Sequence, residues 1–243
     1  MSKIYADTIE TENSNVDITL GAAGDAVLIP SGATLKTNKI ADAGGNNIIT
    51  SDGSGSLTVD SQLKGSEVLL STNTFSGAAS SSFTTKITST YDVYKFVYIS
   101  INPDTDATDF SFQCSIDGGS NYNVTMTTTA FQAYHTEDGS ASSLGYNSGE
   151  DQAQGTAYQI LGGMIGNGAD ENGSGELYLN DPSSTIYVKH FTAETQFYRY
   201  VDRSNNSYFA GYFNTTSAIN AISFKMSSGN MDGVIKMYGI SST

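Results

Sequence analysis

Residues 170–181 carry oxygen-bearing side chains at the spacing of a calcium-binding loop. The candidate ligands are Asp170, Asn172, Ser174, Glu176 and Asp181. Calcium takes six to eight hard oxygen ligands, so a loop that curls such groups around one point is a candidate cation site. The flanking segments read as strands, however, and Pro182 follows at once. An acidic hairpin loop without metal is therefore the alternative interpretation, and calcium is the only cofactor that the sequence suggests.

The inventory for catalysis is small. His135 and His190 are the only histidines, and neither stands in the spacing of a nucleophile elbow or a zinc site. Cys114 is the single cysteine and falls in a core-facing register, which predicts a buried, inert thiol. The neighbouring Glu137 and Asp138 would point to opposite faces of a strand. We expect a protein that is not an enzyme, with a small glycan-cleaving hydrolase as the alternative from another class.

Tyrosine is the richer resource, with 15 copies. Its ring offers amphipathic contact area at low entropic cost and stacks on sugars. The tyrosines in loop-like surroundings are Tyr122, Tyr134, Tyr146 and Tyr208. They are the candidate receptor contacts, and ordinary packing on the core or a sheet face is the alternative.

Alternating hydrophobic residues predict the elements that position these side chains. Phe110, Phe112 and Cys114 alternate with polar residues, as in a strand buried on one face. Residues 94–101 are apolar on both faces, which predicts a strand covered on both sides. Further candidate strands are 67–71, 83–89, 123–129, 157–165, 176–179, 186–192, 196–201, 208–213, 219–226 and 234–240. About a dozen strands without a convincing helix predict an all-β chain with a jelly-roll-like antiparallel β-sandwich.

The aromatic residues divide the chain near residue 65. Of 26 Phe and Tyr residues, only Tyr5 lies within 1–64. That segment has short runs of aliphatic residues about every ten residues, separated by Gly/Ser/Asn turns. We expect residues 1–64 to form a short β-rich stalk or docking arm, whose apolar side chains would be buried between stacked copies of the chain. Residues 65–243 are expected to form the sandwich. A disordered leader is the alternative for residues 1–64.

Charge and composition exclude several classes of partner. Among 243 residues, 11 Lys and Arg face 25 Asp and Glu, a net charge of −14. Phosphate contacts need clustered cations, so we expect no nucleic-acid partner and no anionic membrane surface. No apolar run reaches the length of a membrane span, and the first residues do not resemble a signal peptide. Synthesis in a reducing cytoplasm is expected, although the polar, lysine-poor surface is typical of a protein exposed outside cells.

Several segments resemble structural proteins of tailed bacteriophages of the marine type. Residues 3–9 and 24–35 look like the leaders of virion fibre proteins. Residues 91–96, 115–122 and 228–240 are similar to a β-sandwich module of phage tail proteins. These segments cover both ends and the middle of the chain in order.

The resemblance implies a homotrimeric tail fibre on the virion surface. Residues 1–64 would dock on other virion proteins, and the sandwich would project towards a glycan or protein of the host. A phage protein folds in the host cytoplasm and acts outside it, which explains the absence of disulfides. Because 64 residues are short for a host-reaching shaft, a capsid head fibre or decoration protein is the alternative. The resemblance carries over no catalytic residue.

Overall fold

The computed structural model describes residues 39–41, 46–51, 53–54, 57–59 and 66–240. The chain divides into two units, Met1–Leu63 and Lys64–Thr243, and each is described by itself. In the first unit, β1 (Lys39–Ala41), β2 (Asn47–Ser51) and β3 (Leu57–Val59) form an antiparallel sheet in that order. Most of the expected stalk lies outside the described residues, so the stalk stays a prediction.

The second unit is an antiparallel β-structure of twelve strands. They are β4 (Glu67–Ala78), β5 (Ser81–Phe83), β6 (Val93–Pro103), β7 (Thr108–Ser115), β8 (Met126–Thr136), β9 (Ser142–Tyr146), β10 (Gln159–Ile165), β11 (Gly173–Asn180), β12 (Lys189–Arg199), β13 (Arg203–Phe213), β14 (Ala221–Met226) and β15 (Met231–Ile240). The described residues contain no helix, and hence no helix that is long and apolar enough to cross a membrane. The prediction of an all-β sandwich is confirmed.

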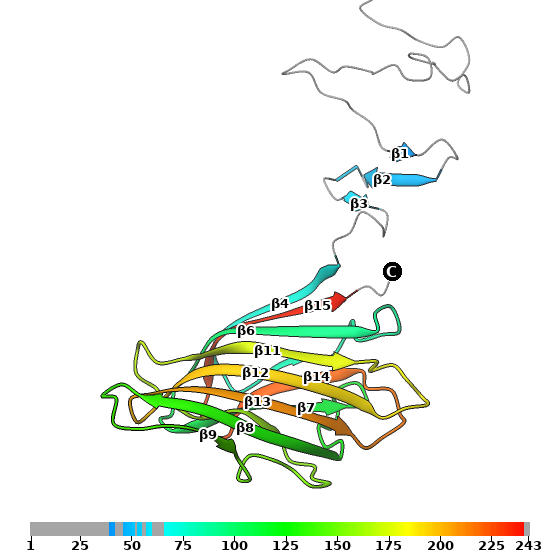
Figure 1. The fold of residues 1–243 in the computed structure, drawn as a ribbon. Helices are drawn as coiled ribbons and strands as arrows, with labels where there is room; N and C mark the ends of the chain where they lie inside the picture. The colour runs from blue at the N-terminus through cyan, green and yellow to red at the C-terminus, as the bar shows by residue number, and fades with distance from the viewer. Residues whose placement is uncertain (1–38, 42–45, 52, 55–56, 60–65, 241–243) are drawn as a thin grey trace, which may run out of the picture. The chain divides into compact units, whose positions relative to one another are not determined.

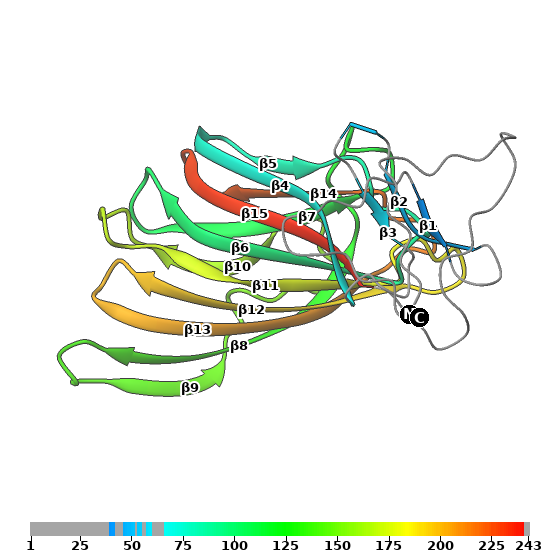
Figure 2. The same cartoon turned by 90° about the horizontal axis from the view of Figure 1, so that it is seen from above.

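The strands form two layers that are nearly closed into a barrel-like sandwich. The large layer has the order β4-β15-β6-β11-β12-β13-β8-β9, and the small layer has the order β10-β7-β14-β5 (Figures 1 and 2). At one edge the layers join where Ile165 of β10 pairs with Arg199 of β12. At the other edge, the Asn73 side chain of β4 donates to Ser81 Oγ (3.1 Å) and Ser82 O (3.2 Å) of β5.

Strand β6 shows how the large layer sorts its side chains. Tyr94, Phe96 and Tyr98 are fully buried between the layers, and the rings of Phe96 and Tyr98 contact aromatic residues of the small layer. The alternate residues, such as Lys95 and Ile99, are partly or largely exposed on the outer face. The prediction that this strand is covered on both sides is therefore wrong, because no third layer among the described residues packs on it.

Strand β7 is the opposite case. Phe110, Phe112 and Cys114 are fully buried, as predicted. The polar side chains of the other face are buried as well, because the chain before β10 covers them. Gln113 Nε2 donates to the carbonyls of Val124, Thr156 and Ala157 at 3.0–3.2 Å. This strand is thus covered on both faces, one apolar and one hydrogen-bonded.

Some predicted boundaries are wrong. The two strands expected at 186–192 and 196–201 are one strand, β12, and the strand expected at 83–89 is only β5. The strand expected at 123–129 begins at Met126 and continues to Thr136, so β8 and β9 occupy much of a segment expected as a loop.

Candidate functional site

A shallow groove crosses the outer face of the large layer over four strands. Cross-strand pairing aligns one row of side chains: Phe131 on β8, Tyr208 on β13, Glu194 on β12 and Glu176 on β11. The next row consists of Thr129, Ala210, Thr192 and Tyr178 on the same strands. Because residues two apart on a strand share a face, both rows point outward. We call the hollow that these eight residues surround the outer groove; its volume is about 310 Å³.

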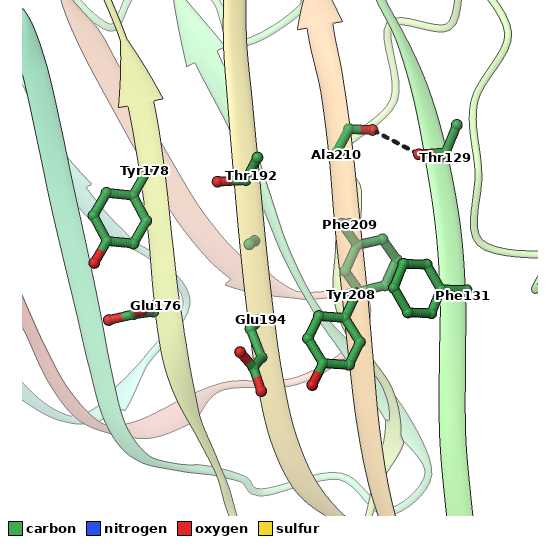
Figure 3. Close-up of a pocket in the computed structure, with 10 residues that line it drawn as sticks. Thr129, Phe131, Glu176, Tyr178, Thr192, Glu194, Tyr208, Phe209 and Ala210 are labelled. Carbon is green, nitrogen blue, oxygen red and sulfur yellow. Dashed lines mark hydrogen bonds between the residues drawn. The ribbon is translucent and has the colours of Figure 1, made fainter. Parts of the chain in front are cut away.

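Aromatic rings form two walls of the outer groove. The rings of Phe131 and Tyr208 are stacked, with centroids 4.8 Å apart and planes 11° from parallel. Tyr178 stands two strands away, on the other side of Thr192 and Ala210 (Figure 3). Neighbouring strands lie about 4.8 Å apart, so the two aromatic walls are separated by roughly 10 Å across the strands. The small side chains between them leave the space for a ligand.

Two carboxylates lie between the aromatic walls. Glu176 is ion-paired with Lys95 at 3.1 Å, and the Lys95 ammonium also contacts Glu67 and lies 5.4 Å from the centre of the Tyr178 ring. Glu194 accepts a hydrogen bond from Asn206 Nδ2 at 2.9 Å. The Glu194 carboxylate, through its hydrogen bond with the hydroxyl, raises the pKa of Tyr208. The described residues give Glu194 no ion pair, so its charge faces the groove.

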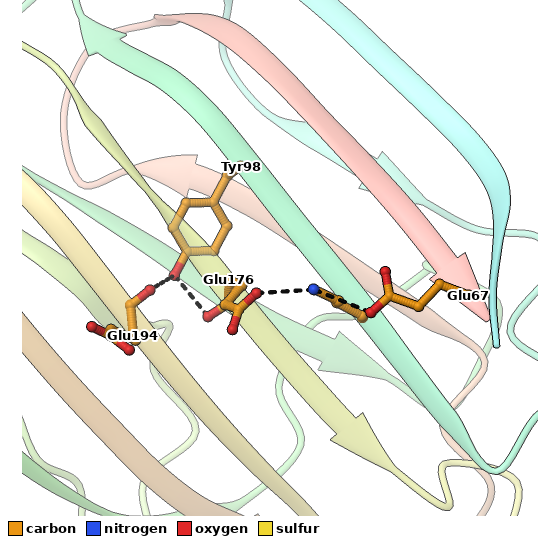
Figure 4. Close-up of polar contacts among 5 residues, drawn as sticks. Glu67, Tyr98, Glu176 and Glu194 are labelled. Carbon is orange, nitrogen blue, oxygen red and sulfur yellow. Dashed lines mark hydrogen bonds and ion pairs between the residues drawn. The ribbon is translucent and has the colours of Figure 1, made fainter. Parts of the chain in front are cut away.

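Buried Tyr98 supports the groove from inside the sandwich. Its hydroxyl donates to the carbonyls of Glu194 (3.1 Å) and Glu176 (3.2 Å), as Figure 4 shows. The same hydroxyl lies 2.7 Å from Thr195 Oγ1. The ring reaches these atoms by passing over Gly175. Burial raises the pKa of Tyr98, which keeps the hydroxyl protonated. Tyr98 therefore fixes the two strand segments that present the groove carboxylates.

This arrangement suits a hydroxyl-rich ligand with an apolar face. Aromatic rings provide flat contact area, while carboxylates and threonine hydroxyls accept and donate hydrogen bonds. Glu176 and Glu194 are direct cross-strand neighbours, and such pairs have Cβ atoms about 4.5–5.5 Å apart. Sequence reasoning missed this carboxylate pair because its members are 18 residues apart and become neighbours only through the β11–β12 pairing.

The four predicted tyrosines occupy different surroundings. Tyr208 lines the outer groove, and Tyr146, on the edge strand β9, pairs with Phe131 and donates to the Asp151 carboxylate. Tyr134 lies on β8 with its ring against the Arg203 guanidinium, and Tyr122 packs near Tyr158. Of the four, only Tyr122 is outside a strand, so the expected loop setting is wrong for the other three.

Two groove aromatics were not among the candidates. Tyr178 belongs to the segment that was read as a calcium loop, and Phe131 belongs to one that was read as a connecting loop. Phe131 comes two residues after Thr129, and Tyr178 comes two residues after Glu176. This alternation is the sequence signal that could have placed each pair on one face of a strand.

The calcium loop does not form. Gly173–Asn180 is the strand β11, in which Ser174 and Glu176 point outward one after the other along an extended chain. A strand advances about 3.3 Å per residue, so Asp170 and Asp181 are held far apart. Among the described residues, no group of three or more His, Cys, Asp and Glu is placed to hold a metal ion. These five residues are therefore not brought together around one point.

The other residues considered for catalysis are also apart. His190 lies exposed on the outer face of β12, and His135 lies exposed on β8. Glu137 and Asp138 lie in the turn between β8 and β9. Cys114 is buried, and burial raises the pKa of its thiol, as expected of an inert cysteine.

No family model matches this sequence, and neither a curated protein nor a solved structure is significantly similar to it. The outer groove, the sequence resemblance and the composition of the chain are therefore the features that bear on function.

Proposed function

We propose that this chain is a non-enzymatic virion protein of a tailed bacteriophage, a short homotrimeric fibre that attaches to a glycan of the host surface. Residues 1–64 dock it on other virion proteins, and the sandwich binds the glycan in the outer groove. The observation that carries the glycan-binding part is the groove itself, in which Tyr178 faces the stacked Phe131–Tyr208 pair across Glu194.

The charge of the groove specifies the type of glycan. Glu194 has no cationic partner among the described residues, and the chain carries a net charge of −14. A polyanionic glycan would be repelled, so the groove suits neutral or amino sugars. The hollow of about 310 Å³ between the aromatic walls leaves room for a sugar ring.

The virion assignment is supported by the resemblance to phage fibre proteins and by composition. A chain with one buried cysteine folds without disulfides, as assembly in a reducing host cytoplasm requires. Its β-rich, acidic sandwich suits exposure on a particle surface, since net charge keeps particles soluble and apart.

Glycan attachment is tested by titrating the full-length protein with neutral and amino-sugar oligosaccharides from a host cell envelope. Tyr178→Ala and Tyr208→Ala should each weaken binding about tenfold or more, because stacking area is lost. Tyr187→Ala is the matched control, since Tyr187 is 68% exposed in a loop outside the groove. Equal affinity of all four proteins would exclude the groove, and the absence of glycan binding would favour a capsid decoration role.

A glycan-cleaving hydrolase is the second candidate, because Glu176 and Glu194 are direct cross-strand neighbours on one sheet face, and glycosidases work with a pair of carboxyl groups. Incubation of the same oligosaccharides with the protein distinguishes the two functions. Turnover that is lost in both Glu176→Gln and Glu194→Gln would support the hydrolase, and binding without turnover supports attachment.

A further inference from the structure

Two arginines face each other at one end of the sandwich, away from the outer groove. Arg199 ends β12 and Arg203 begins β13, and the two residues pair directly across the hairpin. They share a face with the buried Phe197 and Asn205, so both side chains point towards the inside, at the edge where β12 meets β10. Like charges directly opposite one another on a sheet are destabilising.

The sandwich gives this pair of guanidinium groups no carboxylate partner. Within residues 66–240, both ion pairs involve Lys95, so neither arginine is ion-paired there. Arg203 Nε donates to Asn205 Oδ1 at 2.7 Å, and its guanidinium lies 3.9 Å from the centre of the Tyr134 ring. Arg199 Nη2 reaches only the Met164 sulfur at 2.8 Å, and its Nε is buried without a hydrogen-bond partner.

The arginines border a hollow of about 480 Å³, which is within the usual size range of small-molecule sites. Gln132 and Tyr134 of β8 also line it, and Asp109 and Glu150 line another part. Asp109 accepts from the backbone N–H of Met164 at 2.8 Å, while Glu150 Oε2 is buried without a partner. We call this hollow the arginine pocket.

The electrostatics of the arginine pocket are unbalanced. Burial raises the pKa of Glu150, and burial together with the neighbouring Arg199 lowers the pKa of Arg203. Glu150 attracts both guanidinium groups but forms no ion pair with either, so two partly desolvated cations stand side by side with one partly buried carboxylate near them. A ligand carboxylate between the two cations would relieve the repulsion between them. Asp109 and Glu150 in the lining repel a dianion more strongly than a monoanion, so a single negative charge is favoured.

We propose that the arginine pocket is a second binding site, independent of the outer groove, for a small carboxylate-bearing polyhydroxy ligand such as a sugar acid. The carboxylate lies between the Arg199 and Arg203 guanidinium groups, whose planar forks match its two oxygens. The ligand hydroxyls donate to Glu150 Oε2 and Asp109, and Gln132 and Asn147 supply further polar contacts from the lining.

The test is calorimetric titration of the full-length protein with glucuronate, galacturonate, glucose and inorganic phosphate at one ionic strength. At least one uronate should bind saturably, and both glucose and phosphate should bind less tightly. Arg199→Gln and Arg203→Gln should each weaken uronate binding about 30-fold or more, because a charged hydrogen-bonding partner is lost. Lys236→Gln, on β15 at the far part of the large layer, is the matched control for the loss of one positive charge.

Thermal unfolding of the unliganded variants separates binding from folding. Each Arg→Gln change removes one of two facing like charges, so the midpoint should stay the same or rise while the uronate-induced rise disappears. Tighter binding of phosphate, equal binding of glucose, undiminished uronate binding by both variants, or no uronate binding at all would each overturn the proposal.

Discussion

At the scale of the residue, Gly175 is required because the Glu194 carbonyl and the Tyr98 ring occupy the space that a side chain would fill. A Cβ at this position would lie 2.1 Å from Glu194 O and 2.7 Å from Tyr98 Cε2. Gly175→Ala must therefore displace the ring that anchors both groove strands, and we expect a loss of about 1–3 kcal/mol in the free energy of unfolding. Urea denaturation of the full-length protein measures this loss.

Gly145→Ala is the matched control, because Gly145 also lies in a strand and a Cβ there meets nothing within 4 Å. We expect its free energy of unfolding to stay within about 0.5 kcal/mol of the parent. An equal, small effect of both substitutions would show that Tyr98 does not depend on the space above Gly175.

Asp117 makes the turn after β7 sensitive to acid. Its carboxylate accepts from Ser115 Oγ (2.6 Å), Asn121 N (2.9 Å) and Asn121 Nδ2 (2.7 Å). These hydrogen bonds lower the pKa of Asp117 to about 2. Because the folded pKa lies below the unfolded value of about 3.9, the ionised turn adds stability above pH 4 that is lost as the pH falls towards 2.

Asp117→Asn should therefore flatten the fall in unfolding free energy between pH 4 and pH 2, measured by urea denaturation at each pH. Asp138, whose pKa its hydrogen bonds with Ser140 also lower to about 2, gives a parallel contribution that remains in this variant. The slope should thus be reduced and not abolished. An unchanged slope would mean that the hydrogen bonds at Asp117 do not distinguish the two protonation states.

At the scale of the element, β12 and β9 represent the two extremes of the sheet. β12 is paired along its length with β11 and β13 and buries every second side chain. β9 pairs with β8 alone and exposes all five of its residues. Hydrogen exchange followed by mass spectrometry should show the amides of 142–146 exchanging faster than those of 191–197 by several orders of magnitude. Comparable protection would require a partner that covers β9.

The contrast between these strands also explains what could be predicted from the sequence. A strand with one apolar face needs alternation, so the apolar face of β7 is visible as a pattern, whereas β6 is visible as an apolar run and β12 only in two pieces. The Ser/Gly-rich edge strand β9 buries nothing and therefore has no such pattern. The outer groove was less accessible still, because Phe131, Glu176 and Tyr208 meet through pairings between segments far apart in the chain, for which no local residue type is a signal.

At the scale of the whole molecule, the sandwich contains its own core. Every side chain of the main hydrophobic cluster comes from the range between Phe83 and Met237. Residues 1–63 form a separate unit. Folding of the sandwich and the proposed assembly into a trimer can therefore be measured separately.

The proposed trimer is tested by native mass spectrometry of the full-length chain beside a chain that begins at Gly65. We expect a trimer for the full-length chain and mainly monomers for the shorter one. The short aliphatic runs of residues 1–64 lack aromatic residues beyond Tyr5 and can bury their apolar side only against other copies of the chain. The shorter chain should keep its thermal midpoint, since its core is complete. Trimers of both chains would place assembly in the sandwich. Monomers of both would exclude the intertwined stalk and favour a decoration module that is ordered only on its capsid.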